Sequence, residues 1–157
     1  MRVGFGYDVH AFESGRPLLL GGVQIPDAPG LAGWSDADVI SHAIADALLG
    51  AAALGDLGRH FPAGAATEGL SGLKILSSTV DLLQKAGYRV GNVDATVIIQ
   101  QVRIAPYRDR MIAAVAGALS VDPGLVSIKA TTTDRLGLTG RGEGAAATAA
   151  ALIEPAR

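Results

Sequence analysis

Cysteine is absent from the 157-residue chain, so neither a disulfide framework nor thiolate chemistry is available to it. No run of about 18 apolar residues occurs, which argues against a transmembrane helix. An excess of basic charge is also lacking, because 13 Lys and Arg against 15 Asp and Glu give a net charge of −2, unlike a nucleic-acid-binding protein with a clustered basic face. Polar and glycine residues follow Met1 too early for a signal peptide. These absences leave a cytoplasmic enzyme as the simplest interpretation.

Aromatic side chains are scarce as well, at 4% of a chain that is 49% hydrophobic. With 21 glycines and many alanines, the core must consist of small and branched aliphatic side chains, so that helices and strands can approach closely. The length predicts a single domain over residues 1–157. Because large core side chains are few, oligomerisation would help this domain to bury more surface.

Hydrophobic periodicity divides the chain into alternating strands and helices. Strands are predicted at Arg2–Phe12, Pro17–Ile25 (interrupted by Gly21-Gly22), Tyr88–Gln101 and Val126–Thr133, helices from 35–38 to before Gly55, at Ser71–Gly87 and at Pro106–Leu119, and loops at Asp27–Trp34 and Arg59–Leu70. Ser35 or Asp36 could cap the first helix. This alternation is typical of an α/β or α+β sheet layered with helices.

The tail, Glu143–Ile153, is ambiguous. Its alanine content favours a helix by intrinsic propensity. The same small side chains, and the glycines just before them, equally suit a strand that packs closely against another element.

Asp8, His10 and His42 are the first candidates for chemistry. Two residues apart on a predicted strand, Asp8 and His10 leave the same face, and His42 lies near the start of the first helix. Two imidazoles and one carboxylate make a three-ligand zinc site with one position open for substrate. The alternative is a pair of ordinary surface histidines and a loop aspartate, since Asp-x-His is a short motif.

Asp38 and Asp46 lie four residues on either side of His42 along the predicted helix. Either carboxylate could accept the second imidazole N–H of His42 and fix its tautomer. The alternatives are a helix cap for Asp38, which is slightly favoured, and a solvated face for Asp46.

A phosphate-binding segment is indicated by Thr131-Thr132-Thr133-Asp134 and the glycine-rich stretch 137–144. Hydroxyls and backbone N–H groups donate to phosphate oxygens, and Arg141 could clamp one bidentately. Asp134 offers a hard oxygen ligand for magnesium or manganese. The alternative is a threonine-rich strand followed by glycine turns, and Gly55-Asp56-Leu57-Gly58 could likewise grip a sugar diol or simply end a helix.

Taken together, these motifs make the sequence resemble those of the 2-C-methyl-D-erythritol 2,4-cyclodiphosphate synthases. The resemblance covers nearly the whole chain and depends on Gly6–His10, Ser35–Val39, His42-Ala43, Asp46–Gly50, Gly55–Gly58, Gly87-Tyr88, Gly91–Asp94 and Ala130–Gly144. It implies conversion of 4-diphosphocytidyl-2-C-methyl-D-erythritol 2-phosphate to the 2,4-cyclodiphosphate with release of CMP. It also implies an α+β fold with a mixed four-stranded sheet, helices on one face, and a homotrimer whose sheets line the threefold axis with active sites between subunits. The tail then becomes a strand.

The resemblance also assigns roles by position. Zinc, one per subunit, falls on Asp8, His10 and His42, and magnesium or manganese bound with substrate falls on Asp134, where the family often has glutamate. Thr132 is placed at the transition state, and Trp34 takes the position of a family histidine that stabilises the reacting phosphate. Substrate contacts are expected from Val9, Ser35, Asp56, Leu57, Gly58, Phe61, Ile99, Arg103, Ile104, Ala105, Thr131, Thr133, Leu138 and Arg141.

Three departures from the family pattern stand out. An indole at Trp34 cannot act as an imidazole does, although its N–H can donate one hydrogen bond. The segment 63–66 reads Ala-Gly-Ala-Ala where the family usually has aspartates, and Gln101-Val102-Arg103 replaces a proline-containing pattern in the nucleotide loop. A slower or looser enzyme is expected, with a diphosphate hydrolase and a non-catalytic zinc scaffold as the rival interpretations.

Overall fold

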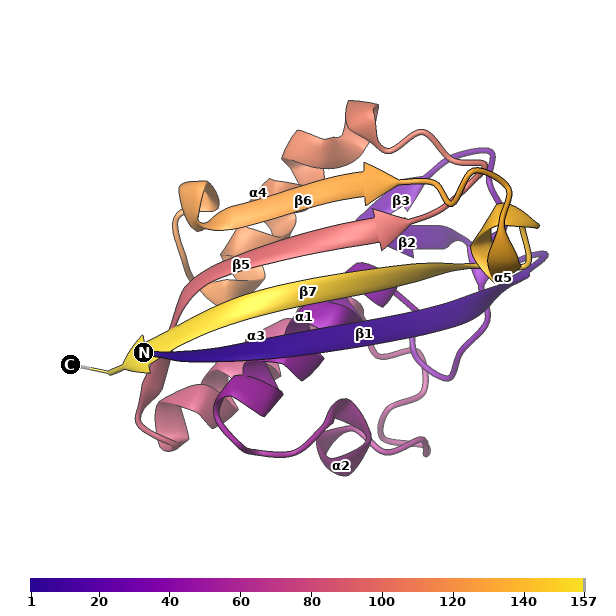
Figure 1. Cartoon of the computed structure of the whole chain (residues 1–157). Coiled ribbons are helices and arrows are strands. Elements are labelled where there is room, and N and C mark those ends of the chain that lie inside the picture. Colours follow the sequence, from indigo (N-terminus) through magenta and orange to yellow (C-terminus); the bar gives the residue numbers. More distant parts are fainter. Residues whose placement is uncertain (157) are drawn as a thin grey trace.

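Residues 1–156 are described by a computed structural model, in which a five-stranded mixed sheet carries helices on one face (Figure 1). The sheet strands are β1 (Arg2–Glu13), β4 (Gly30–Leu31), β5 (Tyr88–Ile98), β6 (Val126–Thr131) and β7 (Gly144–Pro155), and β2 (Leu18–Leu20) pairs with β3 (Val23–Ile25) in a separate hairpin. The helices are α1 (Val39–Ala51), α2 (Leu57–His60), α3 (Gly72–Lys85), α4 (Arg108–Leu119) and α5 (Gly137–Gly140), with short 3-10 turns at Ala105–Tyr107 and Pro123–Leu125.

The predicted α+β class and mixed sheet are confirmed, but the predicted number of four strands is wrong. The fifth strand, β4, is only two residues long and lies inside the predicted loop Asp27–Trp34. It forms because Leu31 and Gly30 pair with Phe12 and Glu13 at the end of β1. A two-residue edge strand has no periodicity of its own, so only the tertiary pairing reveals it.

Strand order in the sheet is β4-β1-β7-β5-β6. Only β5 and β6 run parallel, and α4 lies on the connection between them, as a parallel pair requires a crossover. β7 pairs antiparallel with both β1 and β5, so the predicted tail from Gly144 to Ile153 lies in a central strand, and Glu143 precedes it. The strand prediction is confirmed there, and burial of the alanines overrides their helical propensity.

Helix α1 lies directly on β1, and two glycines make this possible. A Cβ at Gly4 would stand 1.9 Å from the Ala47 carbonyl oxygen, and a Cβ at Gly6 would stand 2.0 Å from that of Ala43. Both glycines, with Asp8 and His10, belong to the face of β1 that meets the helices. The close approach therefore brings the first turns of α1 beside Asp8 and His10.

Local boundaries differ from the predictions in several places. Asp38 caps α1 by accepting from the backbone N–H groups of Ile40 and Ser41, so the predicted caps Ser35 and Asp36 are wrong. The predicted loop Arg59–Leu70 begins inside α2, and α5 was not expected. The hairpin β2–β3 confirms the interruption at Gly21-Gly22, whose φ angles of +54° and +74° suit glycine.

The face of β1 that lies away from the helices is apolar and open. Val3, Phe5, Tyr7 and Val9 are 72%, 68%, 52% and 40% exposed, and they alternate with the residues that face α1. Among residues 1–156, no helix is long and apolar enough to cross a bilayer.

Candidate metal centre and active site

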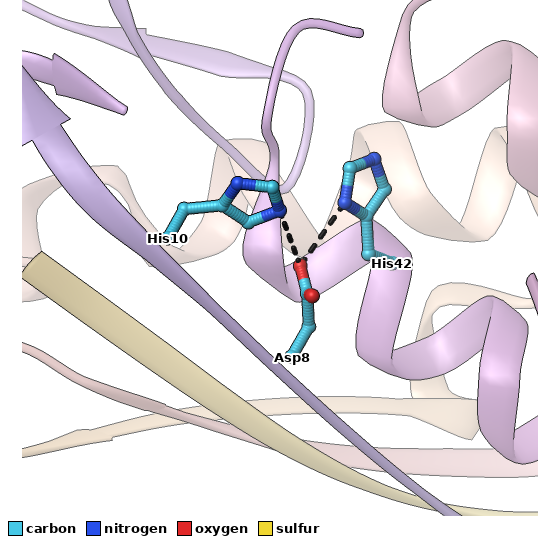
Figure 2. Close-up of side chains that lie close together, drawn as sticks. All are labelled: Asp8, His10 and His42. Atoms are coloured by element: carbon cyan, nitrogen blue, oxygen red, sulfur yellow. Dashed lines mark hydrogen bonds and ion pairs between the residues drawn. The ribbon is translucent and has the colours of Figure 1, made fainter. Parts of the chain in front are cut away.

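Asp8, His10 and His42 converge at the junction of β1 and α1 (Figure 2). One carboxylate oxygen of Asp8 lies 3.0 Å from Nε2 of His10 and 3.0 Å from Nδ1 of His42. One ligand atom from each residue lies within 4.8 Å of the other two. The structure thus brings together the three residues that the sequence singled out.

His10 is held by a backbone carbonyl that the sequence analysis did not single out. Its Nδ1 lies 2.5 Å from the Ala32 oxygen. A carbonyl oxygen only accepts, so Nδ1 must carry a proton and the lone pair for a metal belongs to Nε2, the atom that faces Asp8. The chain segment that follows β4 therefore selects the tautomer of His10.

His42 is oriented by Ser35, whose hydroxyl oxygen lies 3.2 Å from Nε2. The hypothesis that Asp38 or Asp46 accepts this N–H is wrong. The Asp38 carboxylate is fully buried in its capping role, which confirms the favoured alternative. Asp46 accepts from the backbone N–H of Leu57 at 3.0 Å and so fixes the start of α2.

In the metal-free protein, Asp8 and His10 each shift the pKa of the other. Burial alone would raise the pKa of Asp8, but hydrogen bonds from His10 and His42 lower it to about 2. The hydrogen bond to Asp8 in turn raises the pKa of His10 above its ordinary value, against the opposing effect of its own burial. The carboxylate is thus ionised and ready to neutralise positive charge.

The donor set and its spacing suit zinc. Bonds of about 2.0–2.1 Å from a tetrahedral ion place its ligand atoms roughly 3.3 Å apart. The Asp8 oxygen lies 3.0 Å from each imidazole nitrogen, and the two nitrogens lie within 4.8 Å of each other. Only three protein ligands converge among the described residues, whereas a closed structural site has four. A three-ligand set of this kind leaves one coordination position open, as catalytic zinc sites do.

A cavity of about 260 Å³ opens over these ligands. Asp8, His10, His42, Ser35 and Thr67 supply the polar groups that line it. The other lining residues are Trp34, Leu57, Phe61, Ala63, Leu70 and Ile75. The sequence analysis missed Thr67, Leu70 and Ile75, because no motif marks a cavity wall formed by a loop and the start of α3. Asp56 and Gly58 flank Leu57, and Asp56 caps α2 by accepting from Arg59 N–H at 2.9 Å.

The predicted nucleotide-binding residues lie around a second cavity, of about 330 Å³. Ile99, Arg103, Ile104, Ala105, Thr131 and Thr132 line it, together with Val102, Arg108 and Ala130. Arg108 was not predicted, although its place in the first turn after Pro106 could have suggested it. The two cavities have no lining residue in common.

Asp134 stands in the exposed turn after β6, with a left-handed φ of +51°. Its carboxylate lies 3.4 Å from the Thr132 hydroxyl, while the Thr133 hydroxyl lies 3.0 Å from that of Thr139. Arg141 forms an ion pair with Glu143 at 2.6 Å on the surface. Leu138 and Val9 are about two-fifths exposed and line neither cavity.

Sequence relatives match this chain over nearly its whole length. The family model described as "YgbB family" matches residues 1–154. A protein of Syntrophobacter fumaroxidans named 2-C-methyl-D-erythritol 2,4-cyclodiphosphate synthase is 54% identical over 154 residues, which cover 98% of this chain and 97% of the relative. A Salinibacter ruber protein of the same name is 54% identical over 157 residues, covering 99% of this chain and all of the relative.

Solved structures agree with the sequence relatives. The structure titled "IspF (Plasmodium falciparum) CDP complex" is 32% identical, with a TM-score of 0.85 over 99% of this chain and 97% of that one. The bifunctional IspDF from Campylobacter jejuni is 36% identical, with a TM-score of 0.94. The match covers 98% of this chain but only 42% of that longer protein.

Proposed function

The chain belongs to the YgbB family, whose named relatives are 2-C-methyl-D-erythritol 2,4-cyclodiphosphate synthases, and we propose on this basis that it makes the same cyclic diphosphate. The substrate is 4-diphosphocytidyl-2-C-methyl-D-erythritol 2-phosphate, and CMP is released. The enzyme is thus a phosphorus–oxygen lyase of isoprenoid precursor biosynthesis. The observation that carries the proposal is the open three-ligand cluster of Asp8, His10 and His42 at the base of a cavity.

The reaction needs positioning more than proton transfer. The nucleophile, an oxygen of the 2-phosphate, is already an anion, so no general base is required. Attack on the β-phosphorus in line with the departing CMP brings negative charges together, and neutralising and aligning them lowers the barrier. The cavity combines the polar groups of Asp8, His10, His42 and Ser35 with a largely apolar remainder, and we assign the alignment of the phosphates to these polar groups.

We assign Zn²⁺, one per subunit, to Asp8, His10 and His42, and Mg²⁺ or Mn²⁺ arriving with substrate to Asp134. Such ions supply positive charge to phosphate oxygens. The Ala32 carbonyl and the Ser35 hydroxyl keep the two imidazoles oriented. Thr132, whose hydroxyl lies 3.4 Å from the Asp134 carboxylate, is assigned to donate to the reacting phosphate. Asp134 is shorter than the glutamate common in the family, and its turn must compensate for the lost reach.

Substrate contacts are proposed at both cavities. At the metal cavity they are the lining residues Ser35, Leu57 and Phe61, together with Asp56 and Gly58 on either side of Leu57, for the erythritol and ribose hydroxyls and their carbon skeleton. Around the second cavity they are Ile99, Arg103, Ile104, Ala105 and Thr131, for cytidine and its phosphates. Thr133 follows Thr132 in the chain and does not line this cavity, and it is assigned to the same phosphates. Val9, Leu138 and Arg141 lie outside both cavities and are assigned to surfaces that a neighbouring subunit completes.

The two cavities favour a homotrimer with active sites between subunits. A substrate that carries both a nucleotide and a polyol phosphate must reach both sets of residues, yet one chain presents them around separate cavities. The open apolar stripe of Val3, Phe5, Tyr7 and Val9 suits a sheet face that lines the threefold axis.

Two further proposals come from the sequence alone: residues 1–157 form a single catalytic domain, and the enzyme acts in the cytoplasm.

The function is tested by measuring CMP release by wild-type protein and by the His42→Ala variant, with zinc and magnesium present. Wild type should turn over, and His42→Ala should lose at least about 100-fold, because one of three metal ligands is gone. Thermal unfolding and size-exclusion chromatography verify that the variant remains folded and assembled. Full activity in a folded His42→Ala protein would contradict the proposal.

The interfacial site is tested by mixing two inactive variants. His42→Ala lacks one metal ligand but keeps Thr132, and Thr132→Ala lacks the transition-state hydroxyl but keeps all three metal ligands. Each variant therefore keeps the part of the active site that the other has lost. If sites form between subunits, random mixed trimers regain activity at about a quarter of their sites. No recovery after verified subunit exchange would place both halves of the site in one chain.

A further inference from the structure

Trp34, the only tryptophan in the chain, is tied to the segment Phe61–Leu70 at two points. Its indole N–H donates to the Gly64 carbonyl at 2.7 Å, and its own carbonyl accepts from Gly69 N–H at 3.0 Å. The indole therefore binds protein with the single donor that could otherwise reach a phosphate.

The Gly64 carbonyl is the centre of a small, internally bonded turn. It also accepts from Thr67 N–H at 2.9 Å and from Glu68 N–H at 3.1 Å. The Thr67 hydroxyl makes its shorter hydrogen bond, of 2.6 Å, to the Pro62 carbonyl and lies 3.1 Å from the Gly64 oxygen. Ala63, Ala65 and Ala66 are exposed, so hardly any apolar burial holds this turn in place. Its position depends on hydrogen bonds, and the indole supplies the one side-chain bond that reaches it from the segment after β4.

The same turn forms part of the wall of the metal cavity. Trp34, Ala63, Thr67 and Leu70 line it together with the three metal ligands. Where this wall is fastened, water has less access to a phosphate group held at the ligands, and an apolar wall offers water few partners.

We propose that Trp34 is a positioning residue that fastens the segment Phe61–Leu70 over the reacting phosphates and so sets the ratio of ring closure to hydrolysis. The proposal rests on the function proposed above. Two nucleophiles compete for the β-phosphorus. The 2-phosphate oxygen forms the new P–O bond as the bond to CMP breaks and CMP leaves with the electron pair, which gives the cyclic diphosphate. Water in the same place gives CMP, an open-chain bisphosphate and a proton.

Two variants loosen the turn from opposite sides. Trp34→Phe keeps an aromatic ring in the wall but removes the N–H that binds the Gly64 carbonyl. Thr67→Val keeps the volume but removes the hydroxyl that binds the Pro62 carbonyl and lies beside the Gly64 carbonyl. Ala65→Ser, in the same exposed turn, is the matched control. Phosphorus NMR measures the open-chain fraction of the products, and bound zinc is measured for each variant, since no metal ligand is changed.

Both variants should raise the open-chain fraction at least ~10-fold with wild-type zinc content, whereas Ala65→Ser should not. Tryptophan fluorescence gives a readout without turnover. In Thr67→Val the indole should be quenched more strongly by acrylamide than in wild type. A wild-type product ratio in both variants, or unchanged quenching in Thr67→Val, would overturn the assignment while leaving the synthase intact. Absence of CMP release from wild type would remove the proposed function and this inference with it.

Discussion

Replacing Gly6 with alanine should displace helix α1 from strand β1 and weaken metal binding without altering any ligand. The added Cβ would stand 2.0 Å from the Ala43 carbonyl oxygen, whereas ordinary contact begins at 3.4 Å, so the two backbones must separate by about 1.4 Å. His42 precedes Ala43 in α1, and Asp8 follows Gly6 by two residues in β1. The separation therefore acts directly on the ligand cluster.

The expected magnitudes follow from that displacement. Metal–ligand distances tolerate only about ±0.2 Å, so a shift of this size should lower zinc affinity at least ~100-fold. Overpacking with one methyl group typically costs about 1–3 kcal/mol. Two facing backbones move apart less readily than side chains do, so a loss of ~3 kcal/mol or more in the free energy of unfolding is expected.

Competition with a chelator gives the zinc affinity, and urea unfolding gives the stability. Gly50→Ala in the same helix is the matched control, because no atom lies within 4 Å of its added Cβ. It should leave zinc affinity unchanged and stabilise the helix by roughly 1 kcal/mol. Wild-type zinc affinity in Gly6→Ala would refute the view that this close contact sets the ligand geometry.

Three further predictions concern the same site. Ser35→Ala removes the hydroxyl at Nε2 of His42 and should lower zinc affinity about 10–100-fold, and an unchanged chelator titration would argue against that role. Asp38→Ala should cost at least ~3 kcal/mol in urea unfolding, because it removes a helix cap and leaves buried donors unpaired, so a small loss would contradict the role assigned to its hydrogen bonds. In the metal-free protein, protonated His10 contributes to the free energy of unfolding because its pKa is raised. This contribution is complete below the ordinary pKa of 6.5 and is lost as pH rises through the raised value. The pKa of Asp8, lowered to about 2, keeps its carboxylate ionised throughout that range. Zinc must displace the His10 proton, so the rise in Tm on adding zinc should be larger at about pH 8 than at about pH 6, and the reverse order would contradict the ligand assignment.

Much of the fold follows from patterns that are local in the sequence. Strand alternation located Arg2–Phe12 and Tyr88–Gln101, and the helical stripe located Ser71–Gly87, because each of these elements buries one face against the core. The two-residue strand β4 could not be found in this way, since it forms only by pairing with the end of β1.

The candidate metal ligands were accessible to sequence reasoning because Asp8 and His10 share one strand face. Their supporting partners were not, because the Ala32 carbonyl has no side-chain signature and the Ser35 hydroxyl meets His42 only after the chain turns into α1. The strand assignment of the tail Glu143–Ile153 came from the resemblance, since alanine propensity alone favours a helix. Its central position in the sheet was not predicted. Local sequence patterns thus identify the candidate ligands, whereas the groups that orient these ligands are brought to them only by tertiary contacts.

The most direct test of the central claim is phosphorus NMR of the products formed from 4-diphosphocytidyl-2-C-methyl-D-erythritol 2-phosphate. Protein stripped of metal by a chelator is compared with the same protein after one equivalent of zinc per chain and excess magnesium are restored. The account predicts no turnover in the stripped protein, and CMP together with a cyclic diphosphate after metal is restored. Turnover that is indifferent to metal, or CMP accompanied by an open-chain phosphate alone, would contradict it.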